Sequence, residues 1–183
     1  APAVTTLAAE SAAAAPPEQR CAALSGLAGP GYEVVTAEWS PASRLEGRNG
    51  APAMDLPAHC LFRVTIGARE SGIPDMKFGT GIELRLPANW NQRLLFQGGG
   101  GLNGVLLPAI GTVGGFPSAL ARGFAVVSTD SGHRGRNSID ARFGVDQQAK
   151  LDFAYQPLQR TTHEAKHMLQ RFEGRKPEYS YFM

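Results

Sequence analysis

The sequence lacks an apolar run of about 18 residues, the length that a helix needs to cross a bilayer, so we expect no membrane partner. It also lacks a block of one charge, because 18 Lys and Arg side chains are interspersed with 16 Asp and Glu side chains, for a net charge of +2. Nucleic-acid-binding domains usually gather basic residues in a patch, so we expect no nucleic-acid partner either. The oligomeric state is left open.

Cysteine is scarce, with Cys21 and Cys60 only. The pair is consistent with one disulfide or with two buried free thiols. A bridge would fasten the N-terminal segment to a strand and would indicate an oxidising compartment. Residues 1–20 are rich in Ala and Pro, have no apolar stripe and show no intact signal peptide, which predicts a flexible tail.

What is present is a globular composition, with 43% hydrophobic and 19% charged residues in a length typical of one domain. The alternation in 82–87 predicts a strand with one solvated face, and the continuous apolar run in 124–129 predicts a strand buried on both faces. The order of elements predicts an α/β domain with an antiparallel N-terminal edge and a parallel interior. Strands are expected at 32–39, 60–67, 82–87, 93–97, 124–129 and 179–183.

Two helices are expected. The longer runs from about Asp152 to Glu173, with a break or kink at Pro157 and a stop at Gly174. The shorter covers 116–123, ahead of the buried strand. The apolar stripe of the longer helix is predicted to contain Leu158, Thr162, Ala165, Leu169 and Phe172.

Four consecutive glycines, Gly98 to Gly101, follow directly on the predicted strand 93–97. Ordering them is costly, because glycine loses more conformational freedom on folding than any other residue. Such a loop is therefore expected where a ligand approaches the main chain. In α/β-hydrolases a glycine-rich loop after an early strand lends backbone N–H groups to the oxyanion hole, which predicts this role for Gly99, Gly100 and Gly101.

The same glycines allow a second interpretation, since Gly99-x-Gly101-x-x-Gly104 fits the dinucleotide-binding fingerprint, with Asp130 as the ribose carboxylate. That fingerprint needs a helix to begin at its third glycine, whereas GVLLPAIGTVGGFP is loop sequence. Asp130 also lies further along than the usual spacing of about 20 residues. The oxyanion interpretation is favoured.

HEAKH, from His163 to His167, fits the H-E-x-x-H pattern of zinc peptidases, in which two histidines bind the metal and the glutamate is the general base. The third ligand of the extended pattern is missing, because Gln170 and Glu173 occupy its positions. Both histidines also project away from the apolar stripe. We therefore expect solvated histidines and assign no metal ligand.

STDSGH, from Ser128 to His133, contains the three residue types of a hydrolase triad. Triad members converge from separate segments, and no Gly-x-Ser-x-Gly elbow occurs in the sequence. We therefore expect Asp130, Ser131 and His133 to form hydrogen bonds within the loop, with a site-lining role for Asp130 and His133 as the alternative.

Four stretches are distinctive: PAHCLFRVTIG at 57–67, GIELRLPANWNQRLLFQGGGGLNG at 81–104, GFAVVSTDSGH at 123–133 and the segment 143–183 that ends in YSYFM. Together they resemble the tannase and feruloyl esterase family of α/β-hydrolases. The resemblance implies that 21–183 is the N-terminal part of the catalytic domain. It would hold the N-terminal half of the mixed sheet and be truncated just before the nucleophile elbow, with 1–20 as a tail. The resemblance also supports a Cys21–Cys60 disulfide.

The resemblance implies a secreted or periplasmic serine esterase that hydrolyses small aromatic-acid esters through an acyl-enzyme. The serine, which follows a Gly-Cys pair after the strand resembling YSYFM, would lie beyond Met183, as would the aspartate, the histidine and a lid. This chain alone is then expected to be inactive and to need no cofactor, while calcium in some members binds in the lid. Two alternatives are a zinc peptidase built on HEAKH and a non-catalytic binding remnant that keeps the glycine loop.

Overall fold

One mixed β-sheet organises the protein in a computed structural model that describes residues 15–27, 31–46, 53–112 and 117–183. The first three strands of the sheet order pair antiparallel, as does β5 with β7, whereas β6 pairs parallel with both β7 and β9. The predicted antiparallel edge and parallel interior are confirmed. The order is β1 (Tyr32–Ser40), β4 (His59–Arg69), β5 (Lys77–Pro87), β7 (Ala125–Thr129), β6 (Arg93–Gln97) and β9 (Tyr179–Phe182).

Smaller elements surround this sheet. Strand β8 (His133–Arg134) pairs with the start of β5, and β2 (Ser43–Leu45) forms a separate antiparallel pair with β3 (Met54–Leu56). A 3-10 turn, η1 (Leu24–Gly26), follows the first described helix, and another, η2 (Ala141–Val145), precedes α3 (Gln147–Tyr155). Among the described helices, none is long and apolar enough to cross a membrane.

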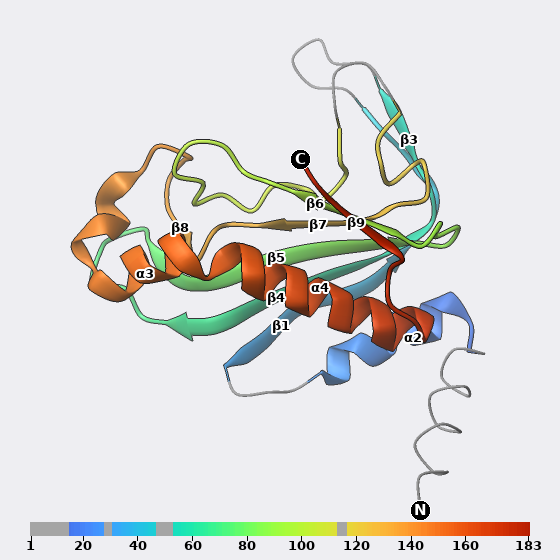
Figure 1. Ribbon diagram of the computed structural model, residues 1–183, viewed down its shortest axis with the longest axis horizontal. Coiled ribbons are helices and arrows are strands. Elements are labelled where there is room, and N and C mark those ends of the chain that lie inside the picture. The colour runs from blue at the N-terminus through green and yellow to red at the C-terminus, as the bar shows by residue number, and fades with distance from the viewer. Residues whose placement is uncertain (1–14, 28–30, 47–52, 113–116) are drawn as a thin grey trace, which may run out of the picture.

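Helix α4 (Pro157–Glu173) lies across one face of the sheet (Figure 1). Ala165, Leu169 and Phe172 are buried in the core, as predicted, with aliphatic and aromatic side chains of β4 and β5. The first part of the predicted stripe is wrong, because Leu158 is 56% exposed and Thr161 takes the buried position. At the N-terminal end of α4, the buried side of the helix therefore contains Thr161 rather than Leu158.

The break predicted at Pro157 is confirmed, because α3 (Gln147–Tyr155) ends just before this proline, whose ring would clash with the preceding turn and which has no N–H to donate. The predicted start near Asp152 is wrong, since α3 already begins at Gln147. The short helix expected at 116–123 is also wrong for its described part, since none of 117–123 is helical and 119–123 forms turns. Position 116 lies outside the described residues. Gly174, with φ 75°, ends α4 as predicted.

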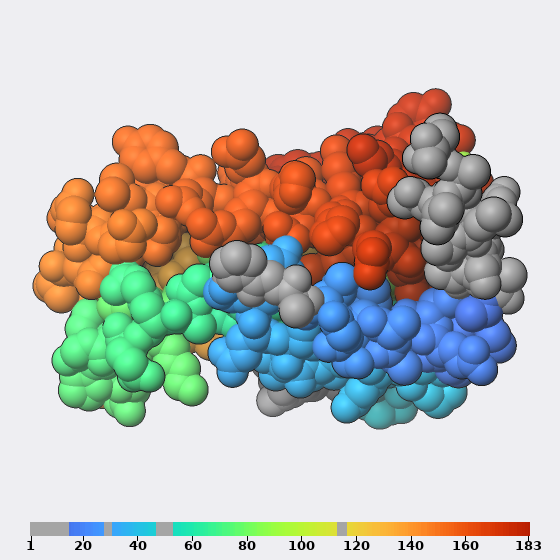
Figure 2. All heavy atoms as spheres, turned by 90° about the horizontal axis from the view of Figure 1, so that it is seen from below, coloured from blue at the N-terminus to red at the C-terminus, as the bar shows by residue number. Residues whose placement is uncertain are grey.

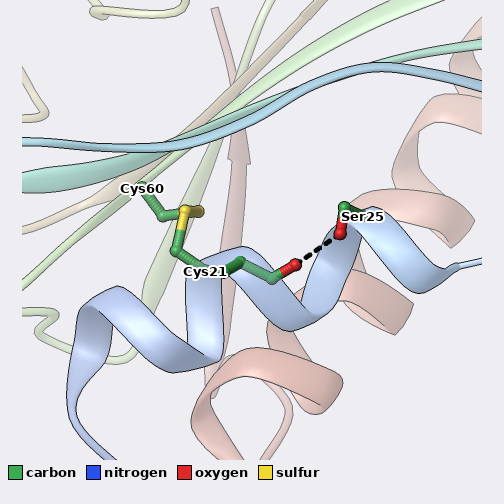
Figure 3. The surroundings of a disulfide bond; sticks show 4 residues. Cys21, Ser25 and Cys60 are labelled. Carbon is green, nitrogen blue, oxygen red and sulfur yellow. Dashed lines mark hydrogen bonds between the residues drawn. A yellow bond between two sulfur atoms is a disulfide. The ribbon is translucent and has the colours of Figure 1, made fainter.

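A disulfide joins Cys21 in α2 (Pro17–Ala23) to Cys60 in β4, with the Cα atoms 5.5 Å apart (Figure 3). Both cysteines are fully buried, so the predicted bridge is confirmed and lies inside the core. Figure 2 shows α2 and β1, in blue, lying alongside the orange-red atoms of α4. The described structure begins before the expected boundary at residue 21, because Pro17 already starts α2; residues 1–14 of the predicted tail lie outside the described residues.

Candidate active site

The glycine loop and the STDSGH segment meet at the carboxyl edge of the parallel strands. Gly98 N–H donates to the carbonyl of Met183 at 2.8 Å, and Met183 N–H donates to Phe96 at 3.0 Å, so the glycine loop begins beside the end of β9. Gly104 N–H donates to the carbonyl of Asp130 at 3.0 Å, which ties the end of the loop to the end of β7. Ligand sites of open α/β sheets occur at this edge.

The middle of the glycine loop presents backbone to solvent. Gly99, Gly100 and Gly101 are exposed, and none of the hydrogen bonds found among the described residues uses their N–H groups. Glycine is required at two of the three positions. A Cβ on Gly101, which has φ 62°, would lie 2.5 Å from the carbonyl oxygen of Ser138, and one on Gly99 would lie 2.4 Å from the side chain of Asn103.

Asn103 anchors the glycine loop to the end of β7, a role that the sequence analysis missed. Its side chain is buried, and its Nδ2 donates to the carbonyl of Thr129 at 2.6 Å and to Ser131 Oγ at 2.9 Å. Its φ of 49° is a conformation that Asn tolerates better than most residues. The Asn-Gly pair at 103–104, one residue after the four glycines, was the available signal, because this dipeptide is typical of tight turns.

Asp130 is buried rather than open to a substrate. Its Oδ1 accepts hydrogen bonds from the N–H of Gly81 at 2.9 Å and of Gly132 at 3.1 Å, and its Oδ2 lies 3.4 Å from Arg134 Nε. Burial raises the pKa of Asp130 to about 7, against the opposing effect of these donors and of the Arg134 charge. Asp130 therefore ties β7 to β5 behind the glycine loop.

His133 is also buried, with its ring stacked on Phe143 at a centroid distance of 3.9 Å. Neither ring nitrogen meets hydrogen-bond geometry with a described residue. Burial lowers the pKa of His133, because it disfavours the charged ring, and the Ser131 backbone opposes this only in part. A Cβ on Gly104 would lie 3.0 Å from His133 Nε2. His133 thus packs behind the loop, and no hydrogen bond found among the described residues joins it to Asp130.

Replacing Asp130 with Asn is expected to change how stability depends on pH. With a native pKa of about 7 and an unfolded pKa near 4, the native state holds the extra proton. Wild-type stability therefore falls as pH rises, and this carboxyl accounts for about 2–3 kcal/mol between roughly pH 5 and 8. In D130N, the side-chain oxygen of Asn can still accept from the N–H groups of Gly81 and Gly132, but the side chain does not ionise. The stability of D130N should therefore not fall in this way as the pH rises.

The measurement is urea unfolding of both proteins at the two pH values. Burial also lowers the pKa of His59 and His133, which gives a slope of opposite sign, but both histidines are common to the two proteins and cancel in the difference. If the free energies of unfolding of wild type and D130N changed equally between the two pH values, the assignment of this pH dependence to Asp130 would be contradicted.

The two histidines of HEAKH lie on the exposed side of α4. His163 and His167 are exposed, and His167 Nδ1 is 3.9 Å from Glu164 Oε2. The Glu164 carboxylate accepts a hydrogen bond from the hydroxyl of Tyr32. No group of three His, Cys, Asp or Glu side chains within the described ranges is arranged to hold a metal ion. The geometry gives the zinc interpretation no support.

The dinucleotide interpretation also finds no support. No helix begins at Gly104, and the described residues that follow it, 105–112, form loop. The space in front of its Cα is filled by the ring of His133. The helix N-terminus that would face a pyrophosphate is therefore missing from this part of the structure.

Comparisons with known proteins agree on one family. Residues 64–183 match the family model described as tannase and feruloyl esterase. The chain is 40% identical over 141 residues to mono(2-hydroxyethyl) terephthalate hydrolase of Piscinibacter sakaiensis, covering 73% of this chain and 23% of that protein. It is 34% identical over 101 residues to a probable feruloyl esterase B-2 of Aspergillus flavus, covering 55% of this chain and 18% of that protein.

Solved structures with a similar fold include two fungal esterases. Feruloyl esterase B of Aspergillus oryzae superposes with a TM-score of 0.69 at 23% identity, covering 92% of this chain and 32% of that structure. An esterase from the same organism superposes with a TM-score of 0.66 at 20% identity, over 91% of this chain and 32% of that one. The chain spans 17% to 26% of the length of the curated relatives that it matches.

Proposed function

The chain belongs to the tannase and feruloyl esterase family and has an α/β-hydrolase fold, and from this premise we propose that it supplies the oxyanion loop of a serine-type carboxylic ester hydrolase. The observation that supports the proposal most directly is that Gly99, Gly100 and Gly101 are exposed at the carboxyl edge of the sheet, with N–H groups that no hydrogen bond among the described residues uses. Backbone N–H groups fixed in this way stabilise the negative charge that develops on a carbonyl oxygen during acyl transfer.

The position of Met183, just after β9 and beside the glycine loop, fits the proposed serine chemistry. In the proposal, the nucleophilic serine lies in the part of the whole protein that follows β9, and β9 ends beside Gly98. The serine oxygen attacks the ester carbonyl, the alcohol leaves, and water then releases the acid from the acyl-enzyme. The glycine N–H groups would face the oxyanion of both tetrahedral intermediates.

The proposed substrates are esters of aromatic acids. The relatives include proteins named as hydrolases of mono(2-hydroxyethyl) terephthalate and of feruloyl esters, both of which are aromatic. The buried disulfide supports an oxidising location, so we propose a secreted or periplasmic enzyme. Calcium, where present, is proposed to bind in a lid outside this chain.

The test uses the whole protein, expressed from its coding sequence through the region beyond Met183. Hydrolysis of 4-nitrophenyl acetate and methyl ferulate is measured for wild type, Gly99→Ala and Gly144→Ala. A Cβ at Gly99 must displace the loop, so kcat should fall about 10²- to 10³-fold, the loss typical of one oxyanion donor. Gly144 lies in η2 with open space around it, so its variant should keep wild-type activity.

An acyl-enzyme further predicts a burst of 4-nitrophenol and inactivation by phenylmethylsulfonyl fluoride. A Gly99→Ala variant with wild-type kcat and unchanged thermal stability would contradict the role of the loop. A folded whole protein that binds aromatic esters without hydrolysing them would instead support the binding remnant.

A further inference from the structure

A second site lies beside the glycine loop, in a groove of about 420 Å³ that opens next to Gly104. Phe62, Val64 and Ile66 of β4 belong to the core under α4, so strand alternation places Arg63 and Thr65 on the opposite face of the sheet. The groove runs along that face, between β4 and the segments that follow the glycine loop and β7. Its walls include Val35, Arg63, Val105, Leu106, Arg134 and Arg136.

Three arginines line this groove, and no carboxylate is among its lining residues. Glu83 and Asp130, which pair with Arg63 at 2.8 Å and Arg134 at 3.4 Å, are each only 1% exposed and lie beneath the surface. Each of these contacts uses the Nε of the arginine, and a guanidinium has five N–H donors. The terminal nitrogens of Arg63 and Arg134 therefore remain available to an anion.

Arg136 is the third arginine of the groove that can bind an anion. One of its terminal nitrogens lies 2.7 Å from Asp75, in a pair whose side chains are both more than half exposed. Such a pair is worth little in water, so Arg136 can turn to a ligand at low cost. Three arginines in one groove favour a carboxylate or phosphate, which a guanidinium can bind through two parallel hydrogen bonds.

The remaining walls are apolar. Val35 is 58% exposed, at the irregularity where the β1–β4 register shifts between Val34 and Thr36. Val105 and Leu106 follow the glycine loop and line the groove as well. A ligand that fits both features has an apolar body and an anionic group, because inorganic phosphate would leave the apolar walls uncovered.

We propose that this groove binds an aromatic carboxylate, with its ring against Val35, Val105 and Leu106 and its carboxylate on Arg134 and Arg136. Binding of such an acid depends only on the groove. Its interpretation as a site for the released acid, separate from the reacting centre, rests on the proposed esterase function, because aromatic acids are what that reaction would produce.

The experiment is calorimetric titration of the whole protein with 4-hydroxybenzoate, and with 4-hydroxybenzamide and inorganic phosphate as neutral and non-aromatic counterparts. The acid should bind with 1:1 stoichiometry and at least tenfold more tightly than either counterpart. Equal binding of the amide would overturn the role of the arginines, and equal binding of phosphate would overturn the aromatic assignment.

Two variants test the location. Arg136→Gln should weaken binding of the acid at least fivefold, and Val35→Asp, which adds a carboxylate to the wall while leaving every ion pair in place, should weaken it at least tenfold. Arg171→Gln, an exposed arginine on α4 away from the groove, is the matched control and should bind as wild type. Binding unaffected by Val35→Asp in a folded protein would overturn the proposal.

A second titration uses protein treated with phenylmethylsulfonyl fluoride, which blocks a reactive serine. Affinity in the groove should stay within twofold of the untreated value, and its loss would place the acid at the reacting centre and overturn the proposal. Binding in the groove without any esterase activity would leave the groove assigned and refute the proposed function. Esterase activity without binding of the acid in the groove would support the proposed function and refute the assignment of the groove.

Discussion

Reduction of the Cys21–Cys60 disulfide is expected to lower the free energy of unfolding by about 4 kcal/mol, the value that the chain-entropy relation gives for cysteines 39 residues apart. The bridge restricts the unfolded chain, and it also holds α2 on β4. Arg20 of the same helix donates to the carbonyl of Phe172 at 2.7 Å, so α2 also has a polar contact with the end of α4. Loss of the bridge should therefore loosen the contact between α2 and the α4 side of the core.

The measurement compares urea unfolding of the oxidised protein with that of the protein reduced by a phosphine. The same amino-acid sequence is present in both, so the difference isolates the covalent link. The double variant Cys21→Ala/Cys60→Ala is the control for the reductant and should not respond to it. A difference below about 1 kcal/mol between oxidised and reduced protein would show that the bridge does not restrict the unfolded chain as the relation assumes.

The sequence predicted those parts of the fold that depend on local patterns. The continuous apolar run at 124–129 became β7, which is buried along its whole length. The glycines after 93–97 indicated a backbone site, and the structure places them at the carboxyl edge where β6, β7 and β9 end. Both are properties of short segments, so neighbours far along the chain were not needed to recognise them.

The failures depend on contacts that the sequence does not show. Residues 82–87 alternate, which predicted one solvated face, but β5 lies between β4 and β7 and is covered on both sides. The polar members of that alternation, Glu83 and Arg85, pair with each other at 2.8 Å instead of facing water. Leu158 likewise looked like a core residue, although α4 turns it away from the sheet.

The candidate site was predicted only in part. Asp130 and His133 were recognised as residues at the end of a buried strand, but their burial behind the glycine loop follows from the packing of Gly81, Gly104 and Phe143 around them. The role of Asn103 depends on two acceptors at the end of β7, about 26 residues further on. Such long-range partners cannot be read from one sequence.

Glu83 is the buried residue whose replacement should cost most. Its two carboxylate oxygens accept from Arg63 and Arg85 at 2.8 Å each, and from the N–H of Ala109 at 3.0 Å. Burial alone would raise the pKa of Glu83, but the hydrogen bonds and charges of these partners hold it below its usual range. Arg85 in turn contacts His59 Nε2 at 3.1 Å, so one carboxylate compensates two guanidinium groups and anchors the segment after the glycine loop.

Glu83→Gln is therefore expected to lower the free energy of unfolding by about 3–5 kcal/mol, because it leaves the charge of Arg85, whose side chain is 12% exposed, without a partner. The matched control is Asp55→Asn. It breaks the Arg44–Asp55 pair, which has a similar distance of 2.9 Å but side chains 61% and 82% exposed, and it should cost less than about 0.5 kcal/mol. Urea unfolding gives both values, and hydrogen exchange at the Ala109 amide should become faster only in Glu83→Gln. Equal losses for the two variants would mean that burial does not decide the strength of these ion pairs, and an unchanged Ala109 amide would mean that Glu83 does not hold the loop.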